Sequence, residues 1–483
     1  MRTSLSHPLQ IAEVKPGPGL GSIGITFCPG KKQPAAMTGG WDRDLELDLD
    51  AIRDWKAAAV VTPVEPHELH ELAVPHLGEE VQRRHMAWHH LPIRDVSTPC
   101  ERFEAQWTEV GPALRHRLRS GFNVVVHCKG GLGRAGTIGA RLLVELGWHP
   151  ADAISAVRSV RPGALETSAQ EAHVHAQAGK SEAVPAKTED AIRDRAVGAL
   201  LGLAVGDAVG TTLEFRNRDS YALLVDMVGG GPFGLRPGEW TDDTAMALAL
   251  ADSLHGADEI DEHDLMQRFV AWWREGMYSC TGSCFDIGNA TRAALGRFER
   301  TGNPVAGDPS PNAAGNGSLM RLAPVAIRWW NDPDKRRDAA ARQSRTTHAA
   351  PEAVDACAAY ADLIAEAIAG RPAHDVLSSR DTGLAGAVAP IMAGRWRGQK
   401  RDTIRASGYV AHSLEAALWS VGRSGSFAEA VLTAANLGED ADTTAAITGQ
   451  LAGAIWGTHG IPAVWLERLG WAQRIRKMAE GLV

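Results

Sequence analysis

The sequence predicts two domains of different fold class, an N-terminal α/β domain and a C-terminal all-α domain. With 483 residues, the chain exceeds what one ordinary hydrophobic core supports. Short apolar runs alternate with helical segments in the first half, whereas strand patterns nearly vanish in the second. Between the halves, residues 179–189 are mostly polar and contain Pro185, which is typical of a linker. We therefore expect domains over residues 1–178 and 190–483.

The first half is expected to contain a mostly parallel sheet. Residues 57–61 (Ala-Ala-Ala-Val-Val) and 124–126 (Val-Val-Val) are uninterrupted apolar runs, as found in strands that are buried on both faces. Residues 48–56 and 138–146 place their apolar positions at helical spacing. Strands that alternate with helices in this way favour a parallel sheet covered by helices.

The second half is expected to be all-α. Its apolar segments are rich in Ala and Leu, and their periodicity is that of helices packed on one another. These segments are residues 196–209, 245–254, 352–368, 412–421 and 445–456.

Composition narrows the possible partners and compartments. Hydrophobic residues make up 44% and charged residues 22% of the chain, a balance typical of soluble globular proteins. The net charge of −8 disfavours binding along nucleic acid, which we expect at most as a modified target. Residues 1–14 lack the apolar core of a signal peptide, and the apolar stretch 196–206 is too short to span a bilayer. Since the six cysteines show no paired spacing, we expect a cytoplasmic protein with free thiols and no membrane partner.

Three acidic motifs stand out in the second half. They are Gly206-Asp-Ala-Val-Gly210 with Glu214, Gly238-Glu-Trp-Thr-Asp-Asp-Thr244, and Asn436-Leu-Gly-Glu-Asp-Ala-Asp-Thr-Thr444. In the last two, a cluster of carboxylates and hydroxyls comes directly before a helical segment of small apolar residues.

Two interpretations of these clusters are open. Thr and Asp can cap a helix, because they accept hydrogen bonds from its free N–H groups and favour its dipole. A cap does not require the adjacent carboxylates Asp242 and Asp243, nor the second pair, Asp440 and Asp442. Carboxylates this close repel each other unless a cation is present. Oxygen donors without His or Cys suit Mg²⁺ or Ca²⁺ rather than zinc, so the spacing favours a divalent-metal site over capping.

Together with other segments, these motifs resemble the ADP-ribosylglycohydrolase family. The resemblance runs from about residue 190 to residue 456, with every motif in order. It includes Asn316-Gly-Ser-Leu-Met-Arg321, Thr347-His348 and Cys280-Thr-Gly-Ser-Cys-Phe-Asp-Ile-Gly-Asn289. The last of these segments is particularly similar to the bacterial branch that includes the dinitrogenase reductase-activating glycohydrolases.

The resemblance implies an all-α fold with two Mg²⁺ ions at its centre. The implied metal ligands are Thr241, Asp242, Asp243, Asp440, Asp442 and Thr443. Glu214 would lie beside the scissile bond or assist the metals, and Asp286 would face the ribose. Gly288, Asn316 and His348 are further substrate-binding candidates. A structural role for the histidine and a simple turn at the asparagine are the alternatives.

The implied reaction is hydrolysis of a glycosidic bond at the anomeric carbon of ADP-ribose. Such a reaction develops oxocarbenium character, which carboxylates stabilise, and a bound metal can orient the ribose hydroxyls and activate a water. The implied substrate is an ADP-ribosylated protein or another ADP-ribose adduct. Arginine is the first expectation from the branch, while serine, nucleic-acid and free ADP-ribose adducts stay open. A catalytically silent binding protein is the alternative.

A second reactive motif lies in the first half, directly after the apolar run at residues 124–126. There the run finishes at Cys128, a Gly-rich loop follows, and Arg134 comes six positions later, before a helix. Glycines let backbone N–H groups converge on an anion, and a helix N-terminus adds positive potential that also lowers a thiol pKa. An arginine can bind two phosphate oxygens at once. The candidate phosphate-binding residues of the loop are Lys129, Gly130, Gly131 and Gly133. An ordinary strand–loop–helix turn with an incidental cysteine is the alternative.

This motif resembles the Cys-x5-Arg signature of tyrosine and dual-specificity phosphatases, and the first half as a whole is similar to the kinase-associated phosphatase branch. The resemblance implies that Cys128 is the nucleophile and that Arg134 binds the phosphate. Asp95 falls where the family has its general acid, which protonates the leaving oxygen. Gln170 is a candidate for positioning the hydrolytic water.

One position departs from the phosphatase pattern. Ala135 follows the arginine where the family has Ser or Thr, and Thr137 lies two residues further on. In the family, this hydroxyl helps the thiolate leave during hydrolysis of the phosphoenzyme. Because Ala135 lacks it, the rate of that second step stays open. We therefore expect a bifunctional hydrolase that acts on a phosphorylated substrate and on an ADP-ribose adduct. A glycohydrolase whose first half binds phosphate without turnover is the alternative.

Overall fold

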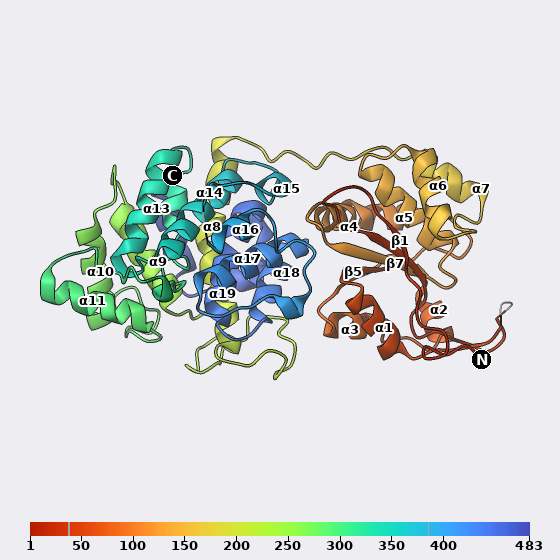
Figure 1. The fold of residues 1–483 in the computed structure, drawn as a ribbon, viewed down its shortest axis with the longest axis horizontal. Coiled ribbons are helices and arrows are strands. Elements are labelled where there is room, and N and C mark those ends of the chain that lie inside the picture. Colours follow the sequence, from red (N-terminus) through yellow and green to blue (C-terminus); the bar gives the residue numbers. More distant parts are fainter. Residues whose placement is uncertain (37–38, 385) are drawn as a thin grey trace. The chain divides into compact units, whose positions relative to one another are not determined.

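The computed structural model describes residues 1–36, 39–384 and 386–483. The protein divides into two compact units, Met1–Glu182 (unit 1) and Ala183–Val483 (unit 2), which Figure 1 shows in different colours. The boundary falls within residues 179–189, the segment expected as a linker. The start of this segment belongs to unit 1, because the carboxylate of Glu182 forms an ion pair with Arg115 at 2.7 Å.

Unit 1 is built around a five-stranded sheet with the strand order β1-β2-β7-β5-β6. Its strands are β1 (Ala12–Val14), β2 (Ile23–Phe27), β5 (Ala57–Thr62), β6 (Ala87–His90) and β7 (Asn123–Cys128). β1 is antiparallel to β2, and the other three pairings are parallel. A separate antiparallel pair consists of β3 (Lys32–Gln33) and β4 (Trp41–Asp42). The two apolar runs form β5 and β7, the central strands, as the sequence predicts.

Helices of unit 1 pack against this sheet. They are α1 (Leu45–Asp54), α2 (Pro66–Glu71), α3 (Leu77–Arg83), α4 (Glu101–Arg119), α5 (Gly133–Glu145), α6 (Pro150–Val160) and α7 (Ser168–His175). Both α4 and α5 contact β7, and α5 is buried along its whole length. The start of α5 is therefore fixed at the carboxyl end of the central strand. The α/β prediction for this half is confirmed.

Unit 2 is helical, as predicted. Its helices are α8 (Glu189–Gly210), α9 (Asp242–Leu254), α10 (Glu262–Glu275), α11 (Asn289–Thr301), α12 (Ala323–Arg328), α13 (Pro333–Thr347), α14 (Pro351–Ile368), α15 (Ala373–Val376), α16 (Val388–Met392), α17 (Val410–Arg423), α18 (Phe427–Ala435), α19 (Ala441–Trp456), α20 (Ala463–Arg468) and α21 (Ala472–Glu480). Short 3-10 turns lie at Thr211–Leu213, Pro311–Ala313, Arg401–Thr403 and Thr458–Gly460. Each of the five segments expected to be helical lies within one of these helices.

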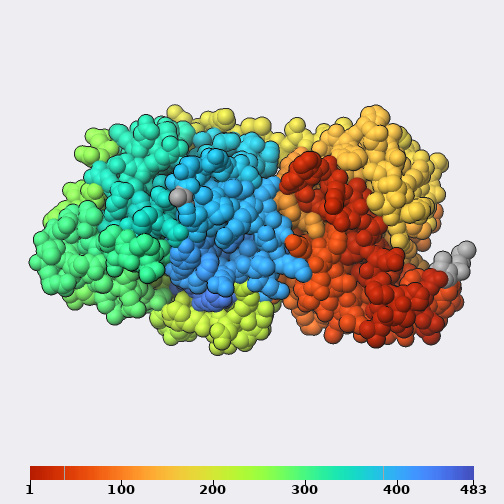
Figure 2. Space-filling view, viewed as in Figure 1, coloured from red at the N-terminus to blue at the C-terminus, as the bar shows by residue number. Residues whose placement is uncertain are grey.

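The first helix of unit 2, α8, is a core helix. Residues Glu189–Leu213 are long and apolar enough to cross a membrane by length and composition, but 94% of the apolar window is buried inside the protein. The segment that follows α8, yellow-green in Figure 2, lies on the surface of unit 2. The chain thus runs from the core to the surface directly after this helix.

The backbones of α8 and α19 touch along a row of glycines. Gly198, Gly202, Gly206 and Gly210 recur every four residues, which places them on one face of α8. A Cβ atom at any of them would lie 2.2–2.3 Å from a carbonyl oxygen of α19, and one at Gly449 would lie 2.0 Å from the Gly202 carbonyl. Only residues without a side chain permit this approach, so the glycines set the distance between the two helices.

We predict that Gly202→Val destabilises unit 2 strongly. The new side chain would overlap backbone atoms, which cannot move aside as a flexible side chain can, so the free energy of unfolding should fall by about 3 kcal/mol or more. Calorimetry should show the melting transition of unit 2 lowered by roughly 6–12 °C while that of unit 1 stays in place. The control is Gly296→Ala in α11, whose Cβ would meet only Arg300 at 3.5 Å. Equal melting temperatures for the two variants would contradict the prediction.

Candidate active sites

The end of α8 is tied to the start of α9 through Asp207. This buried carboxylate accepts hydrogen bonds from the backbone N–H of Thr241 at 2.9 Å and of Thr244 at 3.0 Å. It also accepts from the two threonine hydroxyls, at 2.9 and 2.6 Å. Asp207 therefore caps α9 from outside that helix, a role that the sequence motif around it does not reveal.

Glu214 does the same for α19. Its Oε2 accepts hydrogen bonds from the backbone N–H of Ala441 at 2.8 Å and of Asp442 at 3.3 Å. Two further backbone bonds join the adjacent loops: the Phe215 N–H donates to the Glu439 carbonyl, and the Glu439 N–H donates to the Arg216 carbonyl, each at 2.8 Å. The start of α19 is thereby fixed against the end of α8.

These caps decide between the two interpretations of the acidic motifs. The residues that precede the two helices, Thr241 and Asp440, make no side-chain cap hydrogen bond of their own. Asp207 and Glu214 satisfy the helix termini instead. Asp242, Asp440 and Asp442 face a cavity of about 600 Å³, so capping does not explain the paired carboxylates.

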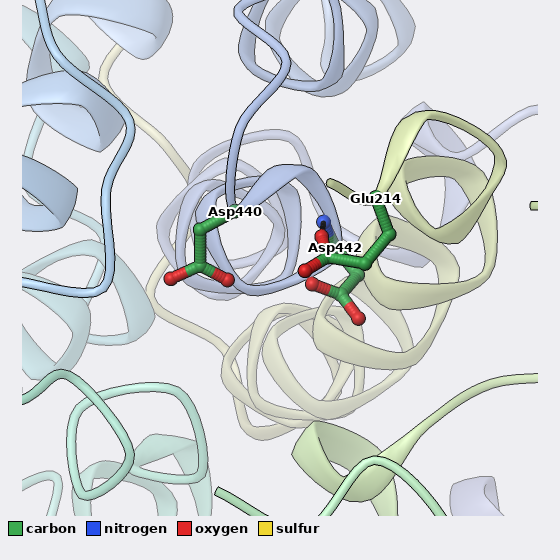
Figure 3. A group of neighbouring side chains, drawn as sticks. All are labelled: Glu214, Asp440 and Asp442. Atoms are coloured by element: carbon green, nitrogen blue, oxygen red, sulfur yellow. Dashed lines mark hydrogen bonds between the residues drawn. The ribbon is translucent and has the colours of Figure 1, made fainter. Parts of the chain in front are cut away.

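The carboxylates of Glu214, Asp440 and Asp442 converge. Each offers one oxygen, and these oxygens all lie within 4.8 Å of one another. Figure 3 shows the three side chains. Asp242 and Thr443 also line the cavity, whereas Thr241 and Asp243 are buried next to them. The Thr241 hydroxyl is 3.2 Å from Asp442 Oδ2, and the Thr443 hydroxyl donates to Asp243 Oδ2 at 3.3 Å. All six predicted metal ligands therefore belong to one cluster.

The cluster contains more negative charge than the surrounding residues neutralise. Loss of hydration, followed by the charge of Asp442, raises the pKa of Asp440 to about 7 and that of Asp286 to about 10. Burial and neighbouring carboxylates also raise the pKa values of Glu214, Asp242 and Asp243. Buried Oδ1 of Asp243 has no hydrogen-bond partner among the described residues. An all-oxygen set with surplus charge and an unused buried acceptor fits hard divalent cations.

The other predicted binding residues of unit 2 line the same cavity. Asp286 and Gly288 form part of its wall at the start of α11. Asn316 donates to Asp440 Oδ2 at 2.7 Å and to the Ser413 hydroxyl at 2.8 Å, so it holds a cluster carboxylate in place. His348 is buried, and burial followed by the charge of Arg321 lowers its pKa to about 3, which keeps the ring neutral. The cavity therefore combines the acidic cluster with walls that include the carboxyl group of Asp286 and the neutral side chains of Asn316 and His348.

In unit 1, the loop after β7 is held by cations outside it. Arg161 donates to the carbonyls of Gly130 and Gly131, each at 3.0 Å, and Lys31 donates to the Lys129 carbonyl at 3.1 Å. Because the N–H of a peptide points opposite its carbonyl, the loop N–H groups turn towards Cys128. The Gly131 N–H indeed donates to the Cys128 sulfur at 3.2 Å. This is the orientation that anion binding requires.

The loop arginine is fixed in place as well. Buried Arg134 forms two hydrogen bonds with the Glu68 carboxylate, at 2.5 and 2.9 Å, and a third with the Ile93 carbonyl at 3.0 Å. Asp95 lies 2.9 Å from the same guanidinium, with its side chain 55% exposed. The structure therefore brings the expected nucleophile, phosphate-binding arginine and general acid together. Glu68 is an addition that no sequence motif signals.

Gln170, the candidate for positioning the hydrolytic water, and Thr137, two residues beyond Ala135, both have hydrogen-bond partners within unit 1. The amide of Gln170 donates to the Ser97 carbonyl at 3.3 Å and accepts from the Glu166 N–H at 2.8 Å. The Thr137 hydroxyl donates to the Gly133 carbonyl within α5 at 2.8 Å. It therefore does not replace the hydroxyl that is missing at Ala135.

Comparisons with known proteins assign unit 2. Residues 188–483 match the family model described as ADP-ribosylglycohydrolase. The chain belongs to this family. An ADP-ribosylarginine hydrolase, Tri1, from Pseudomonas putida (strain GB-1) is 47% identical over 303 residues, which cover 61% of this chain and 79% of the relative. An ADP-ribosyl-[dinitrogen reductase] glycohydrolase from Rhodospirillum rubrum is 32% identical over 308 residues, which cover 61% of this chain and 98% of the relative. The resemblance seen in the motifs is confirmed.

Unit 1 has a counterpart of its own. Residues 58–174 match a family model described as Swiss Army Knife protein, DSP-PTPase phosphatase domain. A cyclin-dependent kinase inhibitor 3 from Rattus norvegicus is 31% identical over 136 residues, which cover 28% of this chain and 63% of the relative. The protein is thus an ADP-ribosylglycohydrolase fused to a phosphatase domain of the dual-specificity type, as the two sets of motifs predict.

We predict opposite outcomes for two neighbouring glycines of the phosphate loop. Gly131 has a φ of +71°, and a Cβ there would lie 2.5 Å from the backbone of Thr26, whereas a Cβ at Gly130 would meet nothing within 4 Å. Gly131→Ala should therefore distort the loop and weaken binding of orthovanadate, a phosphate analogue, by about tenfold or more. Gly130→Ala is the control and should bind it normally. Titration calorimetry measures both, and equal affinities would contradict the assigned loop geometry.

Proposed function

We propose that unit 2 removes ADP-ribose from arginine-linked targets in a Mg²⁺-dependent reaction, and that unit 1 hydrolyses phosphate monoesters through Cys128. The observation that supports the first activity is the carboxylate cluster itself, since Asp242, Asp440 and Asp442 line the cavity while Asp207 and Glu214 cap the helices. The arginine linkage follows from the similarity to ADP-ribosylarginine hydrolases.

Two Mg²⁺ ions would be held by the oxygen donors of the cluster. The proposed ligands are Thr241, Asp242, Asp243, Asp440, Asp442 and Thr443. When bound, the ions supply charge neutralisation, orientation of the ribose hydroxyls and activation of a water. Asn316 keeps Asp440 directed at the cluster, and Asp207 keeps Thr241 in register with it. Both act as positioning residues.

The protein's own residues would bind the sugar and stabilise its transition state. Glu214 has one oxygen committed to the start of α19, so its carboxylate is held at the cavity edge rather than free to rotate. Asp286 faces the cavity from the opposite loop. As positive charge develops at the anomeric carbon, carboxylates placed in this way stabilise it. Neutral His348 can accept or donate a hydrogen bond there without adding repulsive positive charge.

In unit 1, the Cys128 thiolate would attack phosphorus while Asp95 gives its proton to the leaving oxygen. Arg134 and the loop N–H groups bind the three non-bridging oxygens throughout, and Glu68 keeps the guanidinium in plane with them. Water then cleaves the phosphorus–sulfur bond, releasing phosphate and the thiolate. Gln170 is proposed to position this water.

A second candidate for unit 1 is a phosphate-binding module that turns over slowly or not at all. The observation in its favour is the hydroxyl missing at Ala135, which Thr137 does not supply. Attack on the substrate needs only the loop, the arginine and the acid. The module hypothesis therefore predicts that phosphate is bound, or transferred to Cys128, without rapid release.

We predict that ADP-ribose release from an arginine-ADP-ribosylated protein requires Mg²⁺ and is lost in EDTA. Asp242→Asn removes one proposed ligand and should lower release by about a hundredfold or more, together with Mg²⁺ affinity in calorimetry. Asp258→Asn, at an exposed position outside the cavity, is the charge-matched control. Mg²⁺ binding without any release from the wild type would keep the metal site and discard the arginine linkage.

For unit 1, p-nitrophenyl phosphate hydrolysis should disappear in Cys128→Ser and persist in Cys100→Ser, whose thiol is exposed. Ala135→Ser should raise the steady-state rate, because it returns the hydroxyl that helps the thiolate leave. A pre-steady-state burst that is present in the wild type and absent in Ala135→Ser would locate the slow step. Orthovanadate binding with no turnover in either protein would favour the binding module.

A further inference from the structure

Three phenylalanines form a partly exposed cluster beside the metal site of unit 2, which we call the aromatic platform: Phe215, Phe233 and Phe285. The ring centroids of Phe215 and Phe233 lie 6.3 Å apart at 73°, and those of Phe233 and Phe285 lie 5.4 Å apart at 54°. Phe215 is 66% exposed, and the other two are half-buried. Such an exposed aromatic group does not stabilise a core, so its position requires another explanation.

The backbone at the platform and beside it adopts left-handed conformations that residues other than glycine disfavour. Phe215 has a φ of +58°, and Asp286 and Glu439 have φ values of +57° and +61°. All three line the cavity. Left-handed conformations of residues other than glycine cost free energy and persist where surrounding contacts impose them, as they do at ligand sites. Here the imposed contacts are the backbone hydrogen bonds that join Phe215 and Glu439.

The platform begins where the scissile bond is expected. Phe215 directly follows Glu214, whose carboxylate belongs to the acidic cluster, and Phe285 directly precedes Asp286. Of the three rings, that of Phe215 lines the cavity, and Phe233 connects it to Phe285. Exposed Glu439 adds negative charge at the same rim. A group that leaves the anomeric carbon on this side would lie over the aromatic rings and close to carboxylates. Such surroundings suit a planar cation.

We propose that the aromatic platform binds the guanidinium of the ADP-ribosylated arginine, and so selects arginine over other linkages. This proposal rests on the glycohydrolase activity proposed above and adds the residues that recognise the leaving group, the arginine side chain. The guanidinium is planar and weakly hydrated, and it stacks on an aromatic face better than a compact ammonium does. A serine or phosphate linkage presents neither the plane nor the charge.

The proposal is tested with the full chain loaded with Mg²⁺ and ADP-ribose, by calorimetric titration of agmatine, which carries the guanidinium of arginine. The comparison ligand is 1,5-diaminopentane, which has ammonium groups only. Wild type should bind agmatine more tightly. Phe215→Leu should weaken agmatine binding by about fivefold or more and leave diaminopentane binding unchanged, and Phe215→Trp should restore the preference. Val225→Ala, an exposed apolar position in the same segment, is the control.

The outcomes separate this proposal from the proposed activity. Equal binding of the two ligands by wild type, or agmatine binding that Phe215→Leu does not change, overturns the platform even if ADP-ribose is released from arginine. A clear agmatine preference that depends on Phe215 upholds the platform even if no release is detected. Binding of Mg²⁺ and ADP-ribose to Phe215→Leu is measured in parallel. A variant that has lost both is replaced by Phe233→Leu, for which the same weakening is expected.

Discussion

The contact between the α8 and α19 backbones is the constraint on which the site of unit 2 depends. α8 contains Asp207 and leads into Glu214, whereas α19 begins with the carboxylates of Asp440 and Asp442. Because glycines bring the two helices into backbone contact, any larger residue in the row would displace one set of carboxylates relative to the other. Oxygens that must share a cation tolerate little displacement, since hard cations bind only over a narrow range of distances. The glycines between α8 and α19 thus determine how the carboxylates of the two segments are placed relative to each other.

In unit 2, carboxylates from other elements cap the two helices that begin with acidic residues. A helix that starts with Asp or Thr normally uses that side chain to satisfy its own N–H groups. In this protein, Asp207 and Glu214 reach across from α8 to satisfy α9 and α19. The carboxylates at the two helix starts then remain available to face the cavity. One arrangement therefore fixes the two helix starts in place and leaves Asp242, Asp440 and Asp442 facing the cavity.

The sequence predicted the parts of both sites that are contiguous and chemically distinctive. Cys128 and Arg134 lie on one loop, and Asp242 and Asp243 on one helix start, so spacing alone indicated their chemistry. The residue that orients the arginine comes from a distant segment, since Glu68 is 66 positions from Arg134. No local pattern marks such a partner, because the fold alone brings it near. The same limit hid the aromatic platform, whose rings come from two loops, residues 214–241 and 276–288.

Both units place their reactive groups at helix N-termini, with opposite consequences. In unit 1, the start of α5 and the loop N–H groups provide positive potential without an adjacent carboxylate in the loop, so an anion is the ligand that fits. In unit 2, the starts of α9 and α19 face several carboxylates, more than two helix dipoles can offset. The remaining negative charge selects a cation, and a positively charged leaving group gains from the same field.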